Sequence, residues 1–464
     1  MTSSGGGESR SDKRKGAGEV RKRKSCTLDT EVADVAQTDE IQSKRVKNDE
    51  DDVLKVRTRH KKSNSLVITV LGGTILRILC YLFIYDYLSK QPQLSTPFVS
   101  FQRLQSGVAM LKDGVSPYDG DTILIQPVVL HVFSLIWSAP RWVLLTAYIF
   151  LDLLAAASIR DAVQAIFKEL NYKDPDDYAA MAFKFYFLNP LTICTSAILS
   201  LATIYNSLLT LFVYAFCKSA LVTASALLGV IAYFSLYPIV LVISLWIRLR
   251  TFKKISASFG ILALTLAGLF YVNYALNGFS TSFVKNCYGM LLTLDDLTPN
   301  VGVYWYFFAQ IFNPMRVFYL FVFQLILPTM CLVLAFTLRN DVHFHLLISL
   351  ILIAVFSSYP THADAVVYMG LLPIINEIRI YERRQLLLIC TGVTCATFLP
   401  ITWHMWMVSG SGNANYFFAV SLFYNLAQIF CAVDILYMKL MRDAHVVMDP
   451  QRKKKIDIKT IEFF

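Results

Sequence analysis

Long apolar stretches, separated by short polar segments, make up most of the chain after residue 65. A membrane-spanning helix needs about 20 mostly apolar residues, and twelve stretches approach that length and composition. They lie near residues 66–88, 141–162, 179–197, 201–217, 219–234, 236–250, 257–277, 315–338, 342–358, 363–379, 384–407 and 415–440. This pattern predicts an all-α, polytopic membrane helical bundle with about twelve transmembrane helices.

Lysine and arginine are distributed unevenly among the connecting segments. Because basic residues mark cytoplasmic loops, clusters such as those at 55–62, 160–173 and 248–254 predict that both termini lie in the cytosol. The opposite segments hold few basic residues and are expected on the lumenal side; they include 89–140, 278–314, 359–362 and 408–414. This assignment requires that the apolar stretch 122–138, which Pro127 interrupts, is re-entrant or interfacial rather than a full crossing.

Composition separates a charged amino-terminal segment from the membrane part. The chain of 464 residues is 55% hydrophobic and only 16% charged, which excludes an ordinary soluble enzyme of this size. Residues 1–65 nevertheless carry 16 basic and 12 acidic residues and no aromatic residue, so they cannot bury enough apolar surface to fold. We therefore expect a disordered cytosolic tail at 1–65, a multi-pass domain at 66–440 and a basic cytosolic tail at 441–464.

Unusual polar motifs gather in the segments assigned to the lumenal side. Asp295 and Asp296 precede a Pro-Asn pair and the aromatic run 304–308. Paired carboxylates can bind a metal or act as acid and base, but Asp-x-x-Pro is also typical of a turn that begins a helix. The aromatic residues suit the headgroup level of a bilayer, and the same rings could stack on a sugar.

Three further features deserve an interpretation. The first two each allow a structural and a functional one, and the third is expected to be structural. Asn413 and Asn415 lie in a Gly/Ser-rich loop that either makes a tight turn or offers amides to sugar hydroxyls or phosphate. Residues 96–112 have the spacing of an amphipathic surface helix, which either caps the bundle or faces the substrate. Charges within the apolar stretches are expected to pair between helices; they are Arg77, Asp86, Asp152 and Asp434.

Several motifs occur in the same order as in a known family. They are DGVSPY at 113–118, FLNP at 187–190, SLYP at 235–238, DLTPNVGVYWYFFA at 296–309 and SYPT at 358–361. On these residues the chain resembles phosphatidylinositol glycan class U, a membrane subunit of the glycosylphosphatidylinositol (GPI) transamidase. The resemblance extends over residues 66–440, whereas the tail at 1–65 departs from the family.

The resemblance implies a role in attaching GPI anchors to proteins at the endoplasmic reticulum membrane. It implies partners: other transamidase subunits, one of them a cysteine-protease-like subunit with the nucleophile, and either the GPI lipid or the carboxy-terminal signal of the proprotein. The expected lumenal binding residues are Asp296, Asn300, Tyr304, Trp305, Phe308, Asn413 and Asn415, with Ser116, Tyr118, Tyr359 and Asp364 as secondary candidates. We expect no catalytic residue, metal, cofactor or nucleic-acid partner in this chain.

The family also resembles the lipid-linked mannosyltransferases of the GT-C type, which implies a GT-C-like bundle. Those enzymes place an acidic catalytic group early in the first lumenal loop, but residues 89–111 contain no Asp or Glu. Since glycosyl transfer needs a base to take the acceptor proton, a transferase-like body without transferase chemistry is favoured. The alternative function is a dolichol-phosphate-sugar-dependent mannosyltransferase of GPI precursor synthesis, with Asp113 or Asp296 as the base.

Overall fold

The structure, a computed structural model, describes residues 65–448 of the chain. The chain divides into two units, residues 1–68 and 69–464, and the described part of the second unit is the helical bundle. Residues 1–64 and 449–464, which hold most of the two expected tails, lie outside the described residues. All regular elements between residues 65 and 448 are helical, which confirms the all-α prediction.

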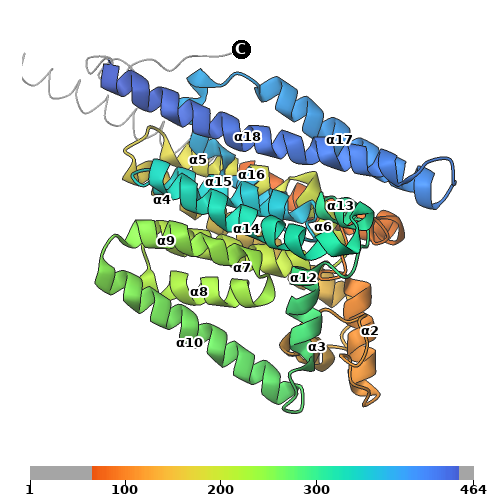
Figure 1. Ribbon diagram of the computed structural model, residues 1–464. Coiled ribbons are helices and arrows are strands. Elements are labelled where there is room, and N and C mark those ends of the chain that lie inside the picture. Colours follow the sequence, from red (N-terminus) through yellow and green to blue (C-terminus); the bar gives the residue numbers. More distant parts are fainter. Residues whose placement is uncertain (1–64, 449–464) are drawn as a thin grey trace, which may run out of the picture. The chain divides into compact units, whose positions relative to one another are not determined.

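The helices follow one another along the chain, joined by turns and loops (Figure 1). A first helix covers Ser65–Leu88. It is followed by α2 (Phe101–Lys112), α3 (Pro127–Leu135), α4 (Arg141–Glu169), α5 (Pro175–Phe187), α6 (Pro190–Ala197), α7 (Leu201–Cys217), α8 (Leu221–Phe234), η1 (Tyr237–Val240), α9 (Leu241–Leu249), α10 (Phe252–Leu276), α11 (Ser282–Val284), η2 (Lys285–Gly289), α12 (Met290–Thr293), α13 (Tyr304–Gln310), α14 (Asn313–Thr337), α15 (Val342–Phe356), α16 (Ala363–Leu371), η3 (Leu372–Tyr381), α17 (Gln385–Met407) and α18 (Ala414–Met448).

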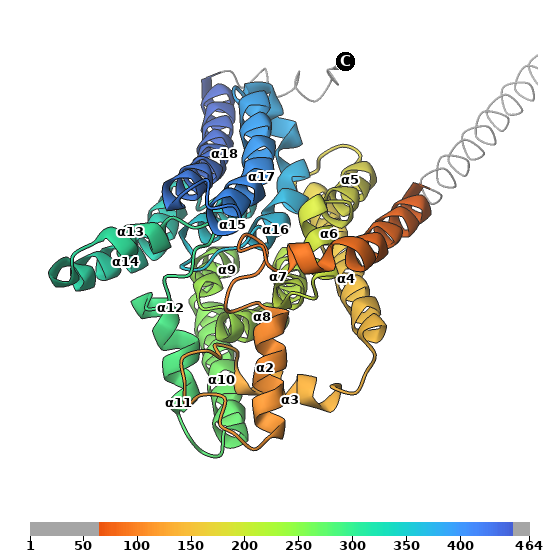
Figure 2. The same cartoon turned by 90° about the vertical axis from the view of Figure 1, so that its right-hand side faces the viewer.

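The interior of the bundle is built around α15. Every residue from Val342 to Val355 is buried, as expected for a helix that is apolar on all sides. Helices α9, α14, α16 and α18 contact α15, while α4 packs against α5 and α7, and α8 packs against α7 and α10. In Figures 1 and 2 the α17–α18 hairpin runs along one side of the bundle and α10 along the opposite side.

Helices occupy all twelve predicted stretches, but three of them do not form one continuous α-helix; one is 236–250, where the 3₁₀ segment η1 precedes α9. Six helices are long and apolar enough to cross a membrane, and four shorter apolar helices of 10–17 residues accompany them. The stretch 179–197 is divided because Asn189 caps α6 by accepting a hydrogen bond from Leu191 N at 2.9 Å, with Pro190 at the first helical position. The stretch 363–379 changes from α16 to the 3₁₀ segment η3 next to Pro373.

The two elements predicted between residues 89 and 140 are shorter than their sequence patterns. The amphipathic helix α2 begins at Phe101 rather than Thr96, and Ser100 caps it by accepting a hydrogen bond from Arg103 N at 3.4 Å. The stretch 122–138 contains only the nine-residue α3. At 1.5 Å per residue it is about 14 Å long, less than half the apolar thickness of a bilayer. This confirms that 122–138 is not a full spanning helix.

Pairing between helices accounts for three of the four charges within the apolar stretches. Arg77 contacts Asp152 at 2.9 Å, and Asp434 lies 3.5 Å from Arg384. Asp86 differs, because it is exposed close to the end of its helix and makes no ion pair with another residue between 65 and 448.

Candidate functional site

An extended segment between α12 and α13 places Asp296 at the surface. The Oδ1 atom of Asp296 accepts hydrogen bonds from the Thr298 amide, at 2.9 Å, and from the Thr298 hydroxyl. Its Oδ2 atom lies 3.6 Å from the guanidinium of Arg103 on α2. The backbone oxygen of Asp296 accepts a hydrogen bond from the Tyr359 hydroxyl at 2.6 Å. Asp296 therefore joins three segments that are far apart in the chain.

Asn300 shapes the turn that leads into α13. Its side chain is 1% exposed; Oδ1 accepts a hydrogen bond from Gly302 N at 2.8 Å, and Nδ2 donates to Thr298 O at 3.2 Å. A Cβ atom at Gly302 would lie 2.7 Å from the ring of Pro360, so the close approach of the two loops requires glycine there. Asn300 therefore acts inside the turn, and its amide is not presented to solvent.

The predicted aromatic binding residues on α13 point into the protein. Tyr304, Trp305 and Phe308 are 1%, 4% and 2% exposed. The ring of Trp305 stacks near Trp406 at a centroid distance of 6.3 Å, and the Tyr304 hydroxyl donates to a backbone oxygen of α14 at 3.3 Å. These three side chains anchor α13 to its neighbouring helices and form the apolar base of the site.

The loop before α18 lies against α13. Asn413 is exposed, and its Oδ1 atom accepts hydrogen bonds from Asn415 N at 3.0 Å and Tyr416 N at 3.4 Å, so it caps α18. The Oδ1 atom of Asn415 accepts a hydrogen bond from the Tyr306 hydroxyl. The side-chain nitrogens of Asn413 and Asn415 donate no hydrogen bond to any residue of the described range. The loop thus makes the predicted turn, and both asparagines are exposed.

The secondary candidates divide into two groups. Tyr359 belongs to the site, because its buried hydroxyl donates to the backbone oxygen of Asp296; burial also raises the pKa of this hydroxyl. Asp364 lies just beyond it at the start of α16, where Oδ2 accepts a hydrogen bond from Thr361 N at 2.6 Å. Ser116 and Tyr118 lie in another region: the Tyr118 hydroxyl donates to Ile125 O at 2.6 Å, and the Ser116 hydroxyl accepts from Tyr118 N at 3.4 Å. The structure does not bring these two residues to the other candidates.

The sequence analysis missed three residues of this region. Arg103 is the only arginine in the predicted amphipathic segment, a signal that was available. Asn425 is buried and donates to Val301 O at 2.6 Å, which ties α18 to the segment before α13. His362 is buried with its ring against Tyr424 at 4.7 Å, and neither ring nitrogen has a partner within residues 65–448. His362 lies in the segment 359–362 that was assigned to the lumenal side, whereas nothing in the sequence distinguished Asn425 from other polar residues in apolar stretches.

The two adjacent aspartates take separate partners. Asp295 accepts a hydrogen bond from the Thr293 hydroxyl at 2.6 Å and lies 3.7 Å from Arg316, whereas Asp296 faces Thr298 and Arg103. Their carboxylates therefore do not converge on one position, as a metal or a shared proton would require. The arrangement favours turn formation and polar recognition.

Comparison with known proteins identifies the family. The sequence profile described as "GPI transamidase subunit PIG-U" matches residues 71–424, which is most of the chain. The chain belongs to the PIG-U family. It is 29% identical over 409 residues to the mouse protein named "GPI-anchor transamidase component PIGU", covering 82% of this chain and 94% of that protein. It is 28% identical over 359 residues to the Saccharomyces cerevisiae "GPI transamidase component GAB1", covering 76% and 88%.

The PIG-U match includes every candidate residue from Ser116 to Asn415. The Schizosaccharomyces pombe "GPI transamidase component GAB1 homolog" is similar to the same extent, at 29% identity over 378 residues, 78% of this chain and 90% of that protein. The predicted family is therefore confirmed, and residues 1–65 lie outside the matched range.

Proposed function

We propose that this chain is a non-catalytic subunit of the GPI transamidase at the endoplasmic reticulum, with both termini in the cytosol. On this proposal it binds the GPI lipid, or the carboxy-terminal signal of the proprotein, on its lumenal side, and it supports the other membrane subunits. The nucleophile belongs to a separate cysteine-protease-like subunit. Support comes from the membership of the PIG-U family and from the polar surface around Asp296.

The observation that carries this proposal is the set of polar groups exposed above buried aromatic rings. Arg103 and Asp296 are partly exposed, and Asn413 and Asn415 are exposed. A guanidinium suits the phosphates of a glycolipid, and amide groups suit sugar hydroxyls. Exposed apolar side chains of α14, among them Val317 and Phe321, offer a surface for acyl chains.

Mannosyl transfer receives less support from the same geometry. The Asp296 carboxylate already accepts two hydrogen bonds from Thr298 and faces Arg103, so it is not a free base. Asp113, the other candidate, follows the last residue of α2, ten residues after Arg103. At 1.5 Å per residue, Asp113 therefore lies about 15 Å along α2 from Arg103, the residue that faces Asp296.

The lumenal binding role is tested by removing both amides. In cells that make only the variant Asn413→Ala/Asn415→Ala, the complex should co-purify normally while surface GPI-anchored protein falls severalfold. Because Asn413→Ala also removes a helix cap worth about 1 kcal/mol, the variant Asn413→Ser/Asn415→Ala keeps a capping oxygen. The matched control is Ser409→Ala/Ser411→Ala, which removes two exposed hydroxyls of the same loop. Normal surface levels in both asparagine variants would contradict the role of these amides.

Analysis of lipid intermediates separates the two functions. Loss of the chain should cause complete GPI precursor to accumulate together with uncleaved proprotein. Accumulation of a mannose-deficient precursor would instead establish the transferase. Co-purification in detergent tests the partners, because a transamidase set that includes the cysteine-protease-like subunit is expected with this chain.

A further inference from the structure

A polar cavity of about 340 Å³ lies at the other end of α15 from the candidate site. The first residues of α15, Val342 and His343, line the cavity, whereas Tyr359 and Pro360, which follow its last turn, contact the candidate site. The basic clusters at 160–173 and 248–254 assign this end of the bundle to the cytosol. Its volume is within the range of about 300–1,000 Å³ that is usual for small-ligand pockets.

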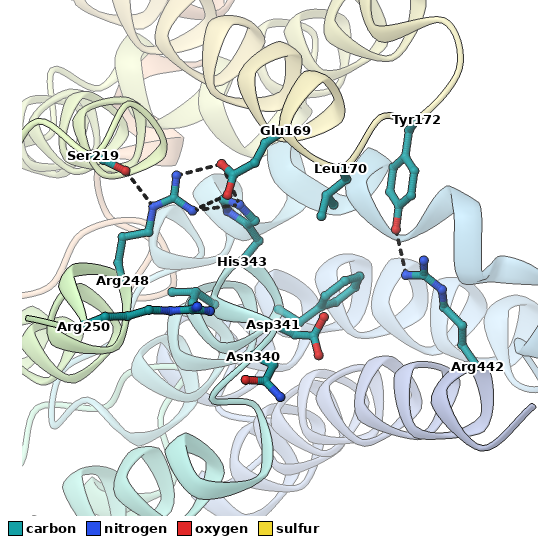
Figure 3. A pocket seen from close by; sticks show the side chains of 12 residues that line it. Glu169, Leu170, Tyr172, Ser219, Arg248, Arg250, Asn340, Asp341, His343 and Arg442 are labelled. Carbon is teal, nitrogen blue, oxygen red and sulfur yellow. Dashed lines mark hydrogen bonds and ion pairs between the residues drawn. The ribbon is translucent and has the colours of Figure 1, made fainter. Parts of the chain in front are cut away.

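Within the described part of the chain, the charges in this pocket leave two guanidinium groups without an acidic partner. Among the charged side chains that line it, the two acids are already paired: Glu169 binds Arg248 through two hydrogen bonds of 2.6 and 2.7 Å, and Asp341 lies 2.7 Å from Lys439. The two remaining charged residues of the lining are Arg250 and Arg442, which lie on opposite sides of the pocket (Figure 3). Arg442 donates to the Tyr172 hydroxyl at 2.7 Å, and the Arg250 side chain makes no hydrogen bond or ion pair with a residue between 65 and 448.

The backbone at Arg250 is unusual for an arginine. This residue ends α9 with a φ of 55°, in the left-handed region that favours glycine or asparagine. Figure 3 shows its side chain directed along the pocket. Left-handed backbone at a non-glycine residue costs of order 1 kcal/mol, and such outliers concentrate at binding sites. A residue that is unfavourable for the turn thus places a free guanidinium beside the cavity.

The pocket also contains an unused nitrogen. His343 is only 5% exposed; its Nε2 atom lies 3.4 Å from Glu169, but Nδ1 has no hydrogen-bond partner among residues 65–448. A buried polar atom of this kind is normally satisfied by protein, water or a ligand. His343 lines the same pocket as Arg250 and Arg442.

We propose that this pocket binds a phosphate-bearing anion, with Arg250 and Arg442 as its principal contacts. A guanidinium presents paired N–H donors that match the geometry of phosphate oxygens, and both acids of the pocket are already neutralised by basic partners. The same chemistry is offered by the headgroup of an anionic phospholipid in the cytosolic leaflet and by a soluble phosphate compound. The proposal concerns a site separate from the lumenal surface and does not depend on it.

The test measures equilibrium binding of radiolabelled dioctanoyl phosphatidic acid and of radiolabelled inorganic phosphate to the detergent-purified complex. The main variant is Arg250→Asn, because asparagine adopts the left-handed region more readily than arginine and so preserves the fold. It should weaken binding at least tenfold, and Arg442→Gln should do the same. Arg250→Lys keeps the positive charge but not the planar guanidinium, so its affinity should lie between those of wild type and Arg250→Asn.

The matched control is Lys253→Gln/Lys254→Gln, which removes two exposed basic residues close to Arg250 but outside the pocket. It should bind within twofold of wild type. If phosphatidic acid binds and inorganic phosphate does not, the proposal is supported with a lipid as the ligand. If inorganic phosphate binds comparably, the proposal is supported with a soluble phosphate compound as the ligand. The proposal is overturned if neither probe binds the wild-type complex, if Arg250→Asn binds as wild type does, or if the lysine control loses as much affinity.

Discussion

Arg77 and Asp152 form an ion pair that is fully enclosed by the protein. The Nε atom of Arg77 donates to Asp152 Oδ2 at 2.9 Å, and the two side chains are 0% and 2% exposed. The same arginine donates to Ser196 Oγ at 3.1 Å and to the backbone oxygens of Gly73 and Phe187 at 3.1 and 3.0 Å. One side chain thus joins the first helix to α4, α6 and the end of α5.

Arg77→Leu should destabilise the bundle by about 3 kcal/mol or more, because it leaves Asp152 buried and unpaired. The double variant Arg77→Leu/Asp152→Leu should be less destabilised than the single one, since it removes both charges. The measurement is the thermal unfolding midpoint of the purified chain in detergent. Arg160→Leu is the control, because Arg160 and Asp161 are 2.8 Å apart and both partly exposed, and exposed pairs contribute less than about 1 kcal/mol. A double variant no better than Arg77→Leu would contradict this explanation.

Gly302→Ala should displace the segment that carries Asp296. The added Cβ would lie 2.7 Å from Pro360 Cδ and 2.8 Å from Asn300 Oδ1, so one of the two loops has to move. Overpacking of this kind costs about 1–3 kcal/mol, and surface GPI-anchored protein should fall with it. Gly392→Ala is the control, since a Cβ there meets nothing within 4 Å. Unchanged surface protein in Gly302→Ala cells would show that the position of this segment is unimportant for function.

Arg103→Gln and Asp296→Asn should separate stability from function. The pair is partly exposed and 3.6 Å apart, so each variant should change the free energy of unfolding by less than about 1 kcal/mol. If these groups hold the lipid, surface GPI-anchored protein should nevertheless fall severalfold. Lys285→Gln is the control, because it weakens a similar exposed pair with Asp121, 3.8 Å apart, away from the site. Equal surface levels in all three variants would remove Arg103 and Asp296 from the proposed site.

His362 should make the bundle less stable in acid. Burial lowers the pKa of His362 to about 4, from an ordinary value of 6.5. Between these values the unfolded chain binds a proton that the folded chain does not, so stability should decrease as pH falls from about 6.5 to about 4. In His362→Phe that part of the pH dependence should disappear from thermal unfolding midpoints measured across this range. An unchanged pH profile in the variant would assign the acid sensitivity to other groups.

Local rules in the sequence predicted many boundaries of the fold, and the exceptions have identifiable causes. The ends of α7, α10 and α15 lie within a few residues of the predicted ones, because long apolar runs end at polar or basic residues. The break at Asn189 was missed because capping by Asn189 and Pro190 interrupts a run that is apolar on both sides. The 96–100 segment was assigned to a helix although Ser100 caps the helix after it.

The candidate site residues were chosen from the sequence, but the orientation of their side chains was not predicted. The run 296–308 and the asparagine loop were found from their polarity, and the structure connects them through Tyr306 and Asn415. The burial of Tyr304, Trp305 and Phe308 was not predicted, since an aromatic side chain suits a membrane surface and a protein interior equally well. Arg103 joined the site only because α2 brings it to Asp296.

The sequence by itself determined the membrane class, the helical content and the family, because apolar length and linear motifs are local properties of the chain. The tertiary structure decided which polar groups are used inside the protein and which are free. Arg77 pairs with Asp152, whereas Arg250 and Arg442 line a cavity and have no acidic partner among residues 65–448. The physical reason is that pairing depends on distances between residues far apart in the chain, and only packing sets those distances.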